Sequence, residues 1–328
     1  MQEKEFTMRL ALYEVLKREL EARPNLIVMG EDIREYGGAF GVTRDLYTHF
    51  PSRVINVPIS ENSYVGVAAG AAMNGLRVVV ELMFMDFITL AMDQIVNHAT
   101  KVAYMYAGQL SVPIVIRTPF GARRGYGPSH SQMLESWFMN IPGLKVVVPS
   151  GPRSAAQLLR ASIMDDSPVL FLEHKLLYDS KEPMGEEDFD VPFPIGKGRL
   201  VREGEDVTVI TYGFGTVLAR EAATRLAQAG VSIEIVDMLS LKPYDKDLIF
   251  ESVGKTGKAV FVEEGVRTGG VGGEVMAEIA EGCIEVLDGR LVRVGAADLP
   301  IPASRPAEDM VLPSVNDIIR GVKKAQEF

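Results

Sequence analysis

Cysteine and histidine are scarce in this chain, which has one cysteine, Cys283, and four histidines among 328 residues. A single cysteine excludes an internal disulfide framework, a CxxC zinc site and an iron–sulfur cluster held by this chain alone. No apolar run reaches the length of a membrane-spanning helix, and the opening MQEKEFTMRL lacks the pattern of a secretory signal. We therefore expect a soluble protein of a reducing, cytoplasmic compartment.

Positive charge is also in deficit, because 34 Lys and Arg face 44 Asp and Glu, which gives a net charge of −10. This balance argues against nucleic acid or an anionic membrane as the main partner. The sequence contains no GxxxxGK[ST] phosphate loop. The length exceeds what one hydrophobic core normally supports, so two domains are expected.

The first half of the chain alternates apolar runs with helical patterns. Strands are predicted at LIVM, RVINV, RVVVEL, VPIVIR, LKVVV and PVLFLE. Helices are predicted between them: one after Thr7 that ends before Pro24, one capped by Ser60 over Tyr64–Asn74, one capped by Asp86 over Phe87–Tyr106, and one near Ala155–Ile163. The alternation predicts an α/β fold with a parallel sheet covered on both faces.

The composition changes at KEPMGEEDFDVPFPIGKG, which is rich in Pro, Gly and acids and has no period. We interpret residues 181–198 as a linker. It separates a domain over residues 1–180 from a second, smaller α/β domain over 199–328, where the alternation begins again at DVTVITYG.

A glycine-rich loop between two predicted strands is the clearest candidate for a site. It follows VPIVIR, contains Arg123 and Arg124, and ends at His130. Ligands of such sheets bind beyond the carboxyl ends of the strands, and loops on a rigid scaffold carry function. The plainer interpretation is that His130 bonds to backbone.

Glu61 is the second candidate, because it follows a predicted strand and begins the Ala/Gly-rich helix. A carboxylate there lies near a positive helix end, although a first-turn acid is common in any helix. The next strand ends in LMFMDF, which includes Met85 and Phe87. This cluster is either core or an apolar slot for a flat ring beside Glu61.

A possible dinucleotide fingerprint occurs in VTVITYGFGTVLA, which contains Gly213 and Gly215. Asp237 lies at the end of the next predicted strand, where an acid that binds a ribose would be expected. Leu218 stands where close helix packing requires glycine. We therefore favour an ordinary strand-to-helix turn over NAD binding.

Six segments, taken together, resemble a known family: GEDIREYGGAFGVT, PISE, MDQIVNHATK, SVPIVIR, HSQMLESWFMNIPGLKVVVPS and LSLKPYD. In this order and spacing they are similar to the β subunit of the thiamine-diphosphate-dependent 2-oxoacid dehydrogenases, the E1 component. The resemblance covers nearly the whole chain. It implies two transketolase-type domains, the first of which binds the pyrimidine ring of the cofactor.

The resemblance also implies roles for individual residues. Glu61 matches the glutamate that hydrogen-bonds the aminopyrimidine ring and promotes the imino form that takes a proton from the thiazolium carbon. Phe87 matches the aromatic residue that packs on that ring, with Met85 nearby. His130 matches the histidine that faces the reacting carbon and serves the substrate carboxylate or acyl transfer. A structural K⁺ site of the family is matched by four positions: Ile114, Ser162, Asp165 and Ser167.

The sequence lacks the GDG motif with which such enzymes hold the diphosphate through Mg²⁺. The resemblance therefore implies an α subunit that holds Mg²⁺, an α₂β₂ tetramer and a lipoylated E2 acyltransferase as acceptor. Pyruvate is the favoured 2-oxoacid, with acetoin and branched-chain 2-oxoacids as alternatives. Two further alternatives are a self-sufficient transketolase-like enzyme, which would need its own diphosphate motif, and a non-catalytic NAD-binding or scaffold subunit.

Overall fold

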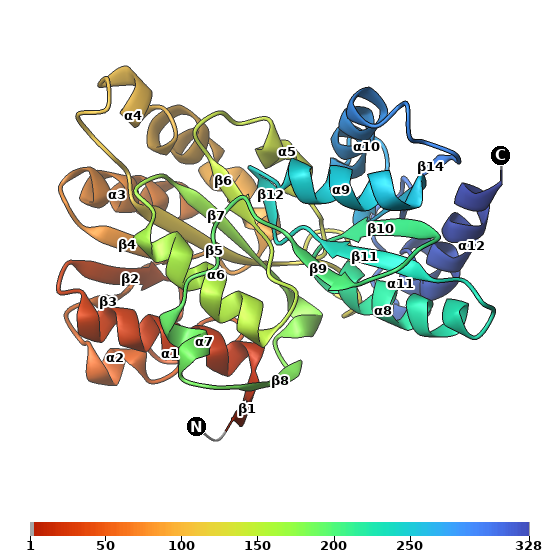
Figure 1. The fold of residues 1–328 in the computed structure, drawn as a ribbon. Helices are drawn as coiled ribbons and strands as arrows, with labels where there is room; N and C mark the ends of the chain where they lie inside the picture. Colours follow the sequence, from red (N-terminus) through yellow and green to blue (C-terminus); the bar gives the residue numbers. More distant parts are fainter. Residues whose placement is uncertain (1–2, 328) are drawn as a thin grey trace. The chain divides into compact units, whose positions relative to one another are not determined.

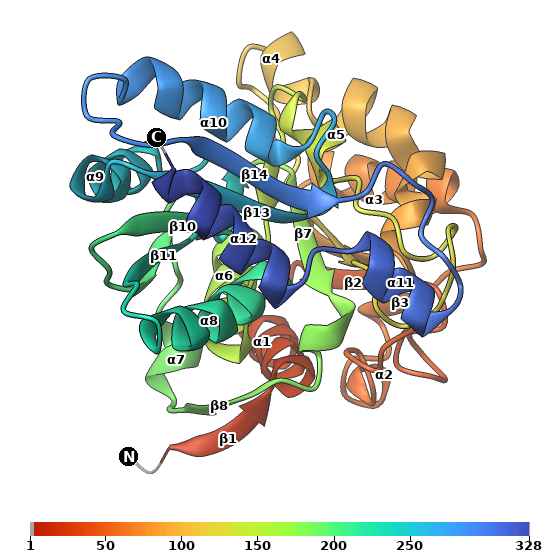
Figure 2. The same cartoon turned by 90° about the vertical axis from the view of Figure 1, so that its right-hand side faces the viewer.

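The computed structural model describes residues 3–327 and divides into two α/β units, shown in Figures 1 and 2. The first unit comprises the residues up to Phe120 together with Trp137–Ile195. The second comprises Gly121–Ser136 together with the residues from Gly196 onward. Within residues 3–327, none of the helices combines the length and apolar character that a membrane crossing requires.

The sheet of the first unit contains six parallel strands in the order β6-β7-β5-β4-β2-β3. They are β2 (Leu26–Gly30), β3 (Val54–Asn56), β4 (Arg77–Glu81), β5 (Ile114–Phe120), β6 (Lys145–Val147) and β7 (Val169–His174). The central strands are buried along their whole length, as continuous apolar runs predict for a sheet covered on both faces. The predicted parallel α/β fold is confirmed.

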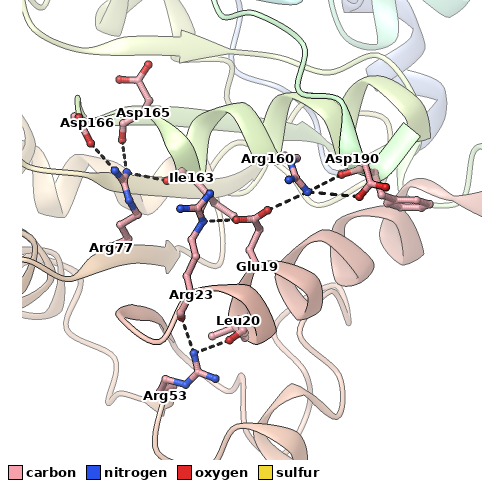
Figure 3. A network of polar contacts seen from close by, with 11 residues as sticks. Glu19, Leu20, Arg23, Arg53, Arg77, Arg160, Ile163, Asp165, Asp166 and Asp190 are labelled. Carbon is pink, nitrogen blue, oxygen red and sulfur yellow. Dashed lines mark hydrogen bonds and ion pairs between the residues drawn. The ribbon is translucent and has the colours of Figure 1, made fainter. Parts of the chain in front are cut away.

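Helices cover both faces of this sheet (Figure 1). On one face α1 (Met8–Ala22) packs against α6 (Pro152–Met164), and α3 (Glu61–Met73) packs on the other. The Thr7 side chain accepts a hydrogen bond from the Leu10 N–H at 3.2 Å, so the predicted cap of α1 is confirmed. Between α1 and α6 the buried Glu19 pairs with Arg23 and Arg160 (Figure 3).

The predicted long helix over 87–106 is wrong. The chain instead forms a 3₁₀ segment η1 (Met85–Ala91), a π-helical segment η2 (Gln94–Ala99) and a short α4 (Val102–Met105), with Asp86 buried inside η1 rather than capping a helix. The reason is tertiary packing against α3. Gly66 of α3 lies so close that a Cβ atom there would be 2.9 Å from Gln94 Oε1. The segment therefore adapts its winding to its neighbour.

The expected linker contains regular structure. β8 (Lys181–Met184) pairs antiparallel with β1 (Lys4–Thr7), and the short α7 (Glu187–Asp190) follows. These elements belong to the first unit, which extends to Ile195.

The sheet of the second unit has the order β14-β13-β10-β11-β9. Its strands are β9 (Arg199–Arg202), β10 (Val207–Thr211), β11 (Ile233–Asp237), β13 (Ala259–Val266) and β14 (Leu291–Ala296), of which only β9 runs antiparallel to its neighbour. Helices α8 (Phe214–Ala227) and α12 (Val315–Gln326) cover one face, and α9 (Lys246–Thr256) and α10 (Val271–Gly282) the other (Figure 2). A short α11 (Arg305–Val311) precedes α12.

The two glycines of the GxG segment serve the turn from β10 into α8. Gly213 has a φ of +56°, and a Cβ atom on Gly215 would lie 2.1 Å from Thr211 Oγ1. Both positions therefore require glycine for local reasons alone.

Candidate functional site

The first candidate residue, Glu61, is the first residue of α3 and follows β3 by a short turn. Ser60 stands at the N-cap position but makes no capping hydrogen bond with its side chain. Glu61 is buried, with 5% of its surface exposed. The positive end of the 13-residue helix favours a carboxylate at this position. The chain thus places a buried acid beside a helix N-terminus.

A second acid accompanies Glu61. Glu31 follows the last residue of β2, is buried, and has its pKa raised to about 7 by burial and by the negative charge of Glu61. Tyr64, one turn along α3, is also buried, and burial together with the charges of Glu31 and Glu61 raises its pKa well above the usual value of a tyrosine. The charge of Glu61 therefore acts on Glu31, and the charges of both acids act on Tyr64. Glu31 was not singled out from the sequence, although it follows the predicted strand LIVM directly after Gly30.

Aromatic rings line up from the loop after β2 to η1. The Phe40 ring lies 5.6 Å from that of Phe84, which lies 6.0 Å from that of Phe87, each in an edge-to-face arrangement. Phe87 keeps part of its surface exposed, whereas Met85 is fully buried. Phe87 therefore keeps part of its ring open to a neighbouring group, whereas Met85 lies in the core.

A buried ionic network joins β4, β5 and β7. The Arg117 guanidinium of β5 donates to Glu81 of β4 at 2.9 Å and to both oxygens of Glu173 of β7 at 2.7 and 2.8 Å. The Tyr178 hydroxyl donates to Glu173 at 2.8 Å. Gly38 has a φ of +78°, and a Cβ atom there would lie 1.9 Å from Glu81 Oε1. The network thus holds the loop after β2 close to the strand ends.

His130 lies in the loop after β5, in the part that belongs to the second unit. Its side chain is half-buried, and its Nδ1 lies 3.0 Å from Ser129 Oγ. Glu135 of the short α5 (Glu135–Met139) follows and accepts a hydrogen bond from the Tyr212 hydroxyl at 2.7 Å. Burial raises the pKa of Glu135 to about 7.

Three of the four residues matched to a K⁺ site lie in or just after the last turn of α6. Ser162 lies in its last turn, and Asp165 directly follows the helix. Arg77 donates to the carbonyl oxygens of Ile163 and Asp165, both at 2.9 Å (Figure 3), and Ser167 donates its N–H to the Asp165 carboxylate at 2.8 Å. The last carbonyls of a helix lack partners within it and favour cations. Each carbonyl keeps a second lone pair, which the K⁺ ion implied by the resemblance would use; Arg77 and Lys145, whose Nζ lies 2.5 Å from Asp165 Oδ2, already bring positive charge to this turn.

Ile114, the remaining residue of that set, is the buried first residue of β5. Among residues 3–327, no three His, Cys, Asp or Glu side chains are placed to hold a metal ion together. That absence concerns side-chain ligands and does not bear on a K⁺ site built from backbone carbonyls.

Comparisons with known proteins agree with this architecture. The model of the transketolase pyrimidine-binding domain matches residues 4–181, and that of the transketolase C-terminal domain matches 196–318. A solved structure described as a split-gene transketolase, inactive beta4 tetramer, has a TM-score of 0.82 and 26% identity and covers 98% of both chains. The fold and these matches define a transketolase-type α/β protein.

Similar proteins of known name indicate a particular family among the transketolase-type proteins. The mitochondrial pyruvate dehydrogenase E1 component subunit beta-2 of Oryza sativa subsp. japonica is 42% identical over 325 residues, which are 98% of this chain and 86% of the relative. The pyruvate dehydrogenase E1 component subunit beta of Rhizobium meliloti (strain 1021) is 40% identical over 318 residues, 97% of this chain and 69% of the relative. The chain belongs to the family of E1 β subunits of the 2-oxoacid dehydrogenases. The resemblance drawn from the sequence is confirmed.

Proposed function

We propose that this chain is the β subunit of a pyruvate dehydrogenase E1 component, which decarboxylates its 2-oxoacid with thiamine diphosphate and transfers the acyl group to a lipoyl group on E2. The observation that carries the proposal is the buried Glu61 at the start of α3, next to Glu31 and Tyr64, in a chain similar to such subunits over nearly its full length. The names of the relatives favour pyruvate over acetoin and branched-chain substrates.

Four residues of the first unit are assigned to the pyrimidine half of the cofactor or to its surroundings. Glu61 would hold a proton at a ring nitrogen, which a carboxyl group shielded from water does well. Phe87 would pack on the ring, with Met85 behind it. Glu31, with its pKa near 7, is partly protonated at neutral pH and would limit the negative charge beside Glu61. When bound, the cofactor supplies the electron sink for cleavage next to the oxo group.

His130 is assigned to the substrate side of the reaction. Its half-buried imidazole, next to Ser129, would orient the substrate carboxylate or move a proton during acyl transfer. This role and that of Glu61 belong to different units of the chain.

An α subunit is assigned as partner in an α₂β₂ tetramer. It would hold the Mg²⁺ that binds the diphosphate, because this sequence lacks the GDG motif. Support comes from large apolar side chains exposed on the first unit: Val67, Leu90, Tyr104 and Met105 are 60, 59, 89 and 68% exposed. Exposed apolar clusters are typical of protein interfaces. We also propose a lipoylated E2 acceptor and a cytoplasmic location. For the two family domains we propose the sequence limits 1–180, 181–198 and 199–328, which the family matches at residues 4–181 and 196–318 support, although the compact units divide the chain differently.

The test is reconstitution with the α subunit. The complex should oxidise pyruvate with lipoamide as acceptor, and the chain alone should neither turn over nor bind thiamine diphosphate tightly in calorimetry with Mg²⁺. Glu61→Gln should lower turnover by about 10²–10⁴-fold with an unchanged circular dichroism spectrum. Glu35→Gln is the matched control, because that side chain is 59% exposed.

Near-normal turnover of Glu61→Gln would refute the assignment of Glu61. Tight cofactor binding and turnover by the chain alone would refute the half-site. A substrate panel that favours acetoin or a branched-chain 2-oxoacid would replace pyruvate but leave the family unchanged.

A further inference from the structure

The loop that carries His130 is tied to the second unit by two buried glutamates far along the chain. Glu264 of β13 accepts the Ala122 N–H at 2.7 Å and Arg123 Nε at 2.9 Å. Glu308 of α11 accepts the Arg123 N–H at 3.1 Å and the Gly125 N–H at 2.9 Å. We define these two carboxylates as the loop clamp. Each uses both of its oxygens on the loop.

Arg123 is the centre of the clamp. Its side chain is 10% exposed, and its Nη2 donates to the Pro313 carbonyl at 2.5 Å. Its carbonyl accepts from Arg305, and its guanidinium lies 5.4 Å from the centre of the Phe214 ring. The backbone N–H, the carbonyl and the side chain of one residue are thus all bound by the second unit. The guanidinium pairs with the buried Glu264 carboxylate, and Arg305 Nε lies 3.7 Å from Glu308 Oε2, so each buried carboxylate has a cation beside it.

The path of the loop is unusual and needs such support. Arg123 has a φ of +70°, which is rare for a residue with a side chain, and Gly125 and Gly127 have φ values of +73° and +77°. A Cβ atom on Gly125 would lie 3.1 Å from the Ala303 carbonyl oxygen. Strained backbone persists only where its surroundings fix it, and it gathers at functional sites.

We propose that Glu264 and Glu308 are positioning residues for His130: through Arg123 they set the course of the loop, so that the second unit decides where the imidazole lies. Only the chemical role of His130 rests on the function proposed above. Glu308 is the sharper probe because it contacts the loop almost entirely through backbone N–H groups. Its two acceptor oxygens face two donors, which glutamine cannot serve, since one of its two atoms is itself a donor.

The first experiment measures the clamp in the full chain without any activity. Hydrogen exchange with mass spectrometry should show slow amides at Ala122, Arg123 and Gly125, and Glu308→Gln should speed exchange at Arg123 and Gly125 by about tenfold or more. Glu251→Gln, at an exposed position of α9, should change nothing in the loop. Unchanged protection in Glu308→Gln would overturn the proposal.

The second experiment follows His130 directly. The chain has four histidines, so their ring signals in NMR are few, and His130→Ala identifies the signal of interest. Glu308→Gln should shift or broaden that signal and leave those of His49, His98 and His174 in place. A shift of all four signals would indicate general loosening, and no shift would leave His130 independent of the clamp. Either result would overturn the proposal.

A double-mutant cycle in the reconstituted complex then separates positioning from stability. Glu308→Gln should lower lipoamide turnover by about tenfold in the native background and by less than about twofold in His130→Ala, because coupled residues are not additive. Equal losses in both backgrounds would overturn the proposal. A native complex without 2-oxoacid turnover would instead refute the proposed function, and exchange and NMR would still decide the clamp.

Discussion

Arg117→Ala should destabilise the first unit strongly. The side chain of Arg117 is 1% exposed and is the cation shared by Glu81 and Glu173, whose side chains are 8% and 1% exposed. Removing one partner of a buried ion pair leaves an uncompensated charge and costs about 3–5 kcal/mol. For units of this size, that loss lowers the melting temperature by roughly 6–20 °C.

The assay is thermal unfolding followed by circular dichroism, with Lys181→Ala as control. Lys181 pairs with Glu5 at 3.1 Å, but the two side chains are 57% and 63% exposed, so this pair contributes at most about 1 kcal/mol. The two variants each remove one cation of the first unit. The difference between their losses of melting temperature therefore reports the burial of the ion pair rather than the change in net charge.

A pH series gives the sharper signature. Burial raises the pKa of Glu81, and the charge of Arg117 opposes that rise. Without Arg117 the pKa should rise further, so the folded variant binds a proton that the unfolded chain binds only at lower pH. The stability that Arg117→Ala loses relative to the wild type should then shrink as the pH falls from 8 to 5. A loss under about 1 kcal/mol, or a deficit that does not change with pH, would refute this reasoning.

Two further predictions concern other parts of the chain. Burial raises the pKa of Glu135 to about 7 and that of Glu263 to about 8, from a usual value of 4.5, so the stability they contribute is complete below pH 4.5 and is lost as the pH rises through 7 and 8. Glu135→Gln should therefore flatten the fall in melting temperature between about pH 4.5 and 7, where the folded chain keeps a proton that the unfolded chain has lost, and a wild-type profile in that variant would contradict the assignment. KCl should raise the melting temperature relative to choline chloride at equal ionic strength, because an ion bound only to the folded state stabilises it. Equal melting temperatures in the two salts would exclude the K⁺ site at the end of α6.

Local patterns in the sequence were sufficient for much of the fold. The runs that became β2, β4, β5 and β7 are apolar enough to predict buried parallel strands, and Thr7 alone marks the start of α1. These features depend on residues within one element. The winding of η1 and η2 depends instead on how closely Gly66 approaches Gln94, and no local pattern records that distance.

The sequence likewise predicted the parts of the candidate site that depend on a single element, but not those that depend on contacts between elements. Glu61 and Phe87 stand out because they follow strands, and the structure places them on elements that can present them. The raised pKa of Glu31 arises mainly from burial and from the nearness of Glu61, which the pairing of β2 and the docking of α3 create. Glu264 and Glu308 lie 141 and 185 residues from Arg123 in sequence, so their contacts with it are a property of the folded unit alone.

Both units secure a loop by the same physical means. Glu81 ends β4, and a hydrogen bond from the Ala39 backbone lowers its pKa against the effect of burial, while Gly38 leaves room for its carboxylate. Glu264, on β13, accepts the Ala122 N–H in the second unit. A buried carboxylate at a strand end can accept several N–H donors, and an arginine offsets its charge in each case: Arg117 and Arg123. Glu81 and Glu264, which hold the two loops, are thus more deeply buried than His130. In our proposal the position of His130 depends on the loop that Glu264 holds. Substitutions at these glutamates should therefore disturb the site without removing any group that touches the substrate.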